Sequence, residues 1–203
     1  MPEDVISTSP ESTSVDALKV AVFSYTHPTI GPIKVGYEAR VDMPSYVATV
    51  TNSTVGANKN HMTIVNTGTR MIRIRKIICS AHITGTIAGA TIMLSIEGIQ
   101  APFPTTGSAI TPKKLNSNFE DIPSGLTVRA APTDVTVASN YVLAIKPLNI
   151  EEAVTTQNNW IELFNKDNEV SSIFLNQNEG IVIKQGTLAG AGALNINAYL
   201  TLD

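Results

Sequence analysis

Residues 194–203, which read LNINAYLTLD, carry the clearest structural pattern in the chain. From Leu194 to Leu202, leucine, isoleucine or alanine stands at every second position, with asparagine, tyrosine or threonine between. A period of two predicts a half-buried β-strand that turns one face towards a core. Since the apolar face of a strand must be covered by a second layer, this stretch predicts a layered β fold.

Similar short runs recur upstream, at 61–65, 91–97, 126–130, 141–147 and 180–185, with Gly, Asn and Pro between them. Short strands at this spacing are typical of sandwiches and jelly rolls. No alternation of strands with helices appears, which argues against a parallel α/β sheet. We predict an all-β fold, an antiparallel β-sandwich of jelly-roll-like type with an extended N-terminal arm.

Three local features qualify this picture. The strand predicted at 71–83 slips by one residue in its alternation at 77–78, which predicts a β-bulge near Lys76. Residues 149–164 are the one plausible helix or long lid, although two consecutive threonines weaken the helical interpretation. A single helical turn is also expected at 113–118.

The domain organisation follows from changes in composition. Residues 1–16 are rich in Ser, Thr, Pro and acidic residues, which is typical of a flexible arm. Residues 17–60 contain extended segments that either join the main sheet or form an assembly extension. Residues 61–203 are predicted to be the β-sandwich domain.

Composition excludes several classes of function. Charged residues make up only 15% of the chain and the net charge is −3, so no basic footprint for nucleic acid is expected. No apolar run approaches the roughly 20 residues of a membrane helix. The N-terminus lacks the basic and apolar regions of a signal peptide, so we expect synthesis in a host cytoplasm.

We predict no catalytic residue, no metal site and no cofactor. The histidines, His27, His61 and His82, fit no metal-binding spacing, and Cys79 is expected to be a small buried residue. The glycine-rich stretch at 186–192 leads into a strand and lacks the helix that a phosphate loop needs.

The carboxylates give no stronger signal. Residues 165–169 resemble only part of a calcium loop. Adjacent pairs such as Glu151 with Glu152 do not establish the separation that a glycosidase requires. Glu120 and Asp121 are expected to form a solvated acidic turn.

Three residues are candidates for an interface: Arg73, Arg75 and Trp160. Arg73 and Arg75 are expected on one strand face, with Lys76 on the other, either solvated or ion-paired, facing a neighbouring subunit, or binding phosphate. Trp160, the only tryptophan, is expected to anchor a core or an interface, or to serve as a sugar platform.

Four stretches carry a family resemblance. Residues 66–79, NTGTRMIRIRKIIC, resemble the opening of small β-sandwich proteins encoded in tailed-bacteriophage genomes. The stretches 109–118, 123–129 and 178–185 are similar to the same group and occur in the same order. The resemblance covers about residues 60–203 and implies a virion component, such as a head-decoration, head-fibre or tail-appendage protein.

From this resemblance, we expect a non-enzymatic virion structural protein of capsid-decoration or auxiliary-head type. Its expected partners are copies of itself, as a homo-oligomer, and other virion proteins such as the major capsid protein. The alternative is a carbohydrate- or receptor-binding module of a tail appendage, which would show a concave site with an exposed Trp or Tyr beside carboxylates. A hydrolase on a β scaffold is a third reading, and it needs polar residues to converge in a pocket.

Overall fold

A computed structural model describes residues 23–27, 31–35, 43–82, 90–150, 160–167, 172–188 and 192–202. The chain divides into two units, Met1–Asp42 and Met43–Asp203. In the first unit, β1 (Phe23–His27) and β2 (Gly31–Val35) pair as an antiparallel hairpin. The remaining strands belong to the second unit, which is the β-sandwich.

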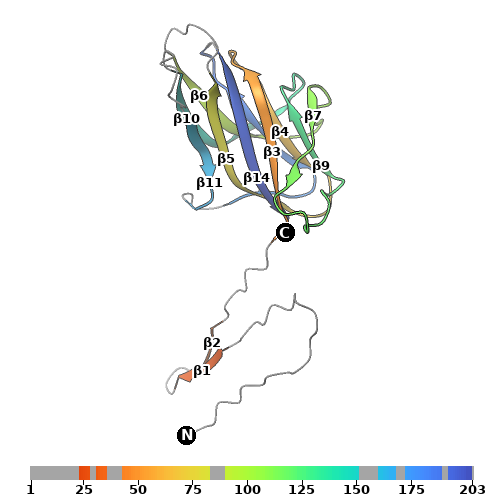
Figure 1. Ribbon diagram of the computed structural model, residues 1–203, viewed down its shortest axis with the longest axis vertical. Coiled ribbons are helices and arrows are strands. Elements are labelled where there is room, and N and C mark those ends of the chain that lie inside the picture. The colour runs from red at the N-terminus through yellow and green to blue at the C-terminus, as the bar shows by residue number, and fades with distance from the viewer. Residues whose placement is uncertain are drawn as a thin grey trace. The chain divides into compact units, whose positions relative to one another are not determined.

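Two antiparallel sheets form the sandwich (Figure 1). Sheet I has the order β10-β6-β13-β4-β9-β7, and sheet II has the order β11-β5-β14-β3-β8, with β12 also paired to β5. The strands are β3 (Ser45–Thr54), β4 (Asn60–Asn66), β5 (Ile72–His82), β6 (Ala90–Ile99), β7 (Ser108–Ile110), β8 (Lys113–Lys114), β9 (Leu126–Ala130), β10 (Val137–Ile150), β11 (Trp160–Asn165), β12 (Ile173–Leu175), β13 (Glu179–Gln185) and β14 (Ala193–Leu202). The chain passes repeatedly from one sheet to the other, and the predicted all-β antiparallel sandwich is confirmed.

The core lies between the sheets, and β14 shows how the sequence builds it. Its alternate residues from Leu194 to Leu202 are all buried, as the pattern predicts. Of the residues between them, Asn195, Asn197 and Tyr199 are only half-buried because they face outward from sheet II, and Thr201 is buried. β14 pairs on both sides, with β3 and β5, so its apolar face sits in the middle of the core.

The predicted bulge in β5 is confirmed, but it changes the face that one residue occupies. Ile74 pairs with Leu200 while Lys76 pairs with Tyr199, so Arg75 is the extra residue. Arg73 pairs with Thr201, which shares a face with Tyr199 because alternate residues of a strand point the same way. Lys76 therefore lies on the same face as Arg73, and the prediction that it takes the opposite face is wrong.

Both helical predictions fail where the structure describes the chain. β10 extends to Ile150 and β11 starts at Trp160; residues 151–159 lie outside the described residues. Lys113 and Lys114 pair with β3, and Asn116 accepts hydrogen bonds from Asn118 and Phe119 in the turn that follows. Pairing with an existing sheet overrides weak local helix propensity. No helix in the described part of the chain is long and apolar enough to cross a membrane.

The sandwich takes in more of the N-terminal region than the predicted range 61–203. β3 lies between β14 and β8 in sheet II, and Tyr46, Ala48 and Val50 contribute buried side chains to the core. The compact unit therefore begins at Met43 rather than at residue 61. The predicted flexible arm, 1–16, lies outside the described residues.

Candidate functional site

One flank of the sandwich is formed by the terminal strands of both sheets, β10 from sheet I and β11 with β12 from sheet II (Figure 1). β10 and β11 lie side by side there, and Lys146 Nζ donates a hydrogen bond of 3.0 Å to the backbone oxygen of Glu162. This contact closes one part of the flank. Elsewhere on the flank, residues of β10 and β12 line a groove.

The groove has a volume of about 300 Å³ and a mainly apolar lining. Tyr141 and Leu143 line it from β10, Ile173 and Phe174 from β12, and Glu179 from the start of β13. Small-ligand pockets start at roughly this volume, and they combine apolar walls with few polar groups. The recess can therefore hold one large side chain or one small ring.

A glycine and a bulge give Tyr141 its position. Val137 pairs with Ile99 and Val142 with Glu97, so residues 138–141 all stand opposite Gly98. A Cβ atom on Gly98 would lie 1.9 Å from Cδ1 of Tyr141, so the tyrosine ring packs directly on the glycine backbone. The bulged segment 138–141 thus places the ring of Tyr141 at the groove, with 57% of the residue exposed.

Large apolar side chains gather on this flank. Val142 and Ile145 on β10 are 50% and 56% exposed, and Trp160 on β11 is 58% exposed. We call the following set the apolar flank: Tyr141, Val142, Leu143, Ile145, Trp160 and Phe174. The other strongly exposed large apolar residues among those described are Met93, on the neighbouring strand β6, and Leu115 and Leu188, which lie in connections.

The predicted interface residues fall at different places. Arg73 packs over the ring of Phe174, with its guanidinium carbon 4.9 Å from the ring centroid, and so borders the groove. Trp160 lies opposite Ser80 at the other end of β5 and is exposed, so the idea that it anchors the core is wrong. Arg75 is the bulge residue, and its backbone oxygen accepts a hydrogen bond from Lys166 N. Lys76 forms an ion pair with Glu162.

A second cluster is polar and buried, and joins three strands. Gln185 Nε2 donates to Leu188 O, so its Oε1 accepts from Gly56 N and from His61 Nε2 at 3.0 and 3.2 Å. His61 Nδ1 is then left to accept the proton of Ser53 Oγ at 2.8 Å. Burial lowers the pKa of His61 to about 4, so the imidazole is a neutral bridge at neutral pH. A Ser–His contact resembles a nucleophile–base pair, but here both side chains are buried and the third member is a neutral amide.

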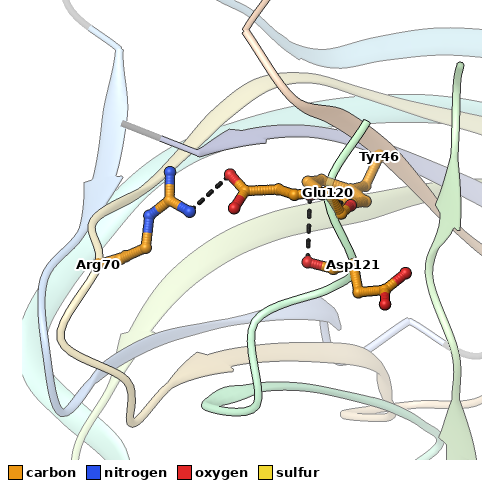
Figure 2. A network of polar contacts seen from close by, with 4 residues as sticks. All are labelled: Tyr46, Arg70, Glu120 and Asp121. Carbon is orange, nitrogen blue, oxygen red and sulfur yellow. Dashed lines mark hydrogen bonds and ion pairs between the residues drawn. The ribbon is translucent and has the colours of Figure 1, made fainter. Parts of the chain in front are cut away.

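A third cluster fastens the segment 115–125 to the sandwich (Figure 2). The buried Tyr46 donates its hydroxyl proton to the backbone oxygen of Glu120 at 2.9 Å, and burial raises the pKa of that phenol. Arg70 pairs with the Glu120 carboxylate at 2.5 Å, and Lys114 pairs with Asp121 at 2.7 Å. The hydrogen bond from Lys114 lowers the pKa of Asp121. The acidic turn is thus ion-paired, not merely solvated.

Sequence reasoning missed the role of Asp134. Its carboxylate accepts hydrogen bonds from the backbone and hydroxyl groups of both Thr105 and Thr106, which hold its pKa well below the usual range. Asp134 comes two residues after Pro132, a weak turn signal that does not reveal its partners. Within the described residues, no group of three His, Cys, Asp or Glu side chains could hold a metal ion. Glu169, in the stretch that resembles part of a calcium loop, lies outside the described residues.

Comparison with known proteins gives no relative: no family model, curated protein or solved structure matches the chain. The geometry of the sandwich therefore carries the functional argument.

Proposed function

We propose that the protein is a non-enzymatic structural protein of a tailed-bacteriophage particle, a capsid-decoration or auxiliary head protein that packs on neighbouring subunits. The observation that carries the packing role is the apolar flank. Exposed large apolar side chains on the edge strands offer a surface for interaction, aromatic residues and Arg are enriched in protein interfaces, and Trp, Tyr and Arg dominate their binding energy. The assignment to a virion is supported by the resemblance of residues 66–79 and the three later stretches to phage β-sandwich proteins.

Low charge supports the same proposal. On the outer face of sheet II, β3 and β14 present short neutral side chains such as Thr49 and Asn197, and Thr49 Oγ1 donates to Asn197 Oδ1 at 2.9 Å, whereas β5 carries Arg73 and Lys76 on this face. The part of this face formed by β3 and β14 has little charge to desolvate when another protein covers it. It can pack against the major capsid protein while the apolar flank serves a different contact.

The test is a mass-spectrometric search for the protein in purified particles, with its copy number measured against the major capsid protein. We expect a fixed stoichiometry, and a ratio near that of the capsid protein would place it on the head. Absence from particles that otherwise carry all their structural proteins would refute the virion role.

The groove favours one second candidate, a carbohydrate- or receptor-binding module. Tyr141 is exposed beside a recess whose rim carries Glu179, an arrangement in which a sugar ring can stack on the tyrosine and donate hydroxyl protons to the carboxylate. A glycan-array screen of the wild-type protein tests this candidate. Specific binding that is lost in Tyr141→Ala would establish it, and an array without hits would remove it.

A further inference from the structure

We propose that the apolar flank docks on the same flank of a second copy of this chain, through a two-fold contact centred on β10. The inference rests on the proposed function in holding that the sandwich packs on neighbouring subunits; it adds which surface does so and with which partner.

The shape of the flank suits contact with itself. It presents a recess, lined by Tyr141, Leu143 and Phe174, next to projecting side chains, Val142 and Ile145, that are half exposed. In a two-fold contact, each copy offers the same patch, so a patch with both a recess and projections can complement itself. The aliphatic projections of one copy fill the recess of the other.

The charges on the flank also permit this contact. Residues 137–145, VASNYVLAI, carry no charged side chain, so two copies of this stretch of β10 bring no like charges together. The groove is bordered by one cation and one anion, Arg73 on Phe174 and Glu179 on β13. A two-fold axis at β10, beside the groove, can bring Arg73 of each copy towards Glu179 of the other, whose Oε2 also accepts hydrogen bonds from Asn176, and this favours this partner and this register.

The far ends of the sheets lack these properties. β8, which ends sheet II, consists of Lys113 and Lys114, and a two-fold contact there would oppose like charges. β7, which ends sheet I, has only three residues. β10 is long, and its one charged side chain, Lys146, donates a hydrogen bond to the backbone of Glu162. Its two register shifts interrupt the edge, so it does not template endless strand addition. A closed dimer held by side chains fits this geometry better than a continuous sheet.

The test is the solution mass of the full chain by sedimentation velocity over a wide concentration range. We expect a dimer in the wild type and at least a tenfold weaker dimer in the double variant Val142→Lys with Ile145→Lys. The matched control is Leu115→Lys with Leu188→Lys, which places the same charges at equally exposed leucines away from the flank. Thermal melts verify that both double variants fold.

A second measurement uses cysteine cross-linking. The native Cys79 is buried and its thiol pKa is raised to about 12, so it gives little background. Val142→Cys should yield a covalent dimer with a short bismaleimide, and Leu188→Cys should not. A wild type that stays monomeric at every concentration, or equal cross-linking of the two cysteine variants, would overturn the inference.

These outcomes separate this inference from the virion role. A flank-dependent dimer that is absent from particles would keep the flank assignment and refute the virion role. A monomer found at fixed stoichiometry in particles would do the reverse.

Discussion

The polar cluster around His61 and the apolar flank around Tyr141 differ in how far their side chains are buried and satisfied. In the cluster, both ring nitrogens of His61 have partners on other strands, and the ring is fully buried. On the flank, apolar side chains that could have been covered lie half exposed. From this contrast we expect the His61 cluster to contribute to the stability of the fold and the apolar flank to contribute to association with a partner. Changes in the cluster should cost stability, whereas changes on the flank should cost association.

The largest effect is expected from His61→Ala. The substitution leaves Ser53 Oγ and Gln185 Oε1 short of one partner each and opens a cavity, which should lower the free energy of unfolding by about 3–4 kcal/mol. Urea denaturation measures it. Val142→Lys on the flank is the control and should change stability by less than about 0.5 kcal/mol. Equal losses in the two variants would contradict the contrast.

The change of stability with pH is expected to be nearly as large as the effect of His61→Ala. The pKa of His61 is about 4 in the folded protein, against 6.5 as its ordinary value. Between these values the unfolded chain binds a proton that the folded protein does not, so stability falls as the pH drops from 6.5 to 4. The full shift corresponds to about 3 kcal/mol. Denaturation curves at several pH values measure it, and His61→Gln should flatten this part of the profile.

Effects of intermediate size on stability are expected from substituting two glycines, Gly125 and Gly98. A Cβ on Gly125 would meet the backbone of Gly68, with N at 2.0 Å, whereas the nearest atoms to a Cβ on Gly98 belong to the exposed ring of Tyr141. Because backbone cannot move aside, Gly125→Ala should cost about 2–3 kcal/mol. Gly98→Ala should cost about 1 kcal/mol or less, since the ring can swing outward. The ranking is tested by thermal melts, and the reverse order would show that the flank is as tightly fixed as the turn.

The smallest effect on the isolated protein is expected from deleting residues 1–16. If this segment acts in assembly, its loss should leave the melting temperature of the sandwich unchanged while weakening incorporation into particles. Quantitative mass spectrometry of particles made with the shortened chain measures incorporation. Unchanged copy number would remove the segment from the assembly role.

Local pattern predicted most of the strands, because strand formation here follows residue type. The alternation at Leu194–Leu202 and the slip at 77–78 correspond to β14 and to the bulge at Arg75. The face taken by Lys76 could not be read from the sequence, since it depends on which side of the slip the extra residue falls. At the described ends of 149–164, the helical alternative is wrong, because β10 runs to Ile150 and Trp160–Asn165 pairs with β5, which local propensity does not register.

The groove could not be predicted, because it is made by residues that are distant in sequence. The alternating run at 141–147 showed that Tyr141 and Leu143 belong to a strand. Phe174 comes to the groove only because β12 pairs with β5, and Arg73 reaches that ring through the same pairing. The burial of His61 between Ser53 and Gln185 likewise depends on three strands meeting, so the sequence offered only a histidine at the start of a strand.

The hydrogen bond from Lys146 to the backbone of Glu162 sets a mechanical limit on the flank. It links β10, the terminal strand of sheet I, to β11, the terminal strand of sheet II. The link restrains the separation of these two strands, and with it the opening of the groove, before a partner binds. A site that is already formed loses little conformational entropy on binding, so it can bind even a small projecting side chain tightly.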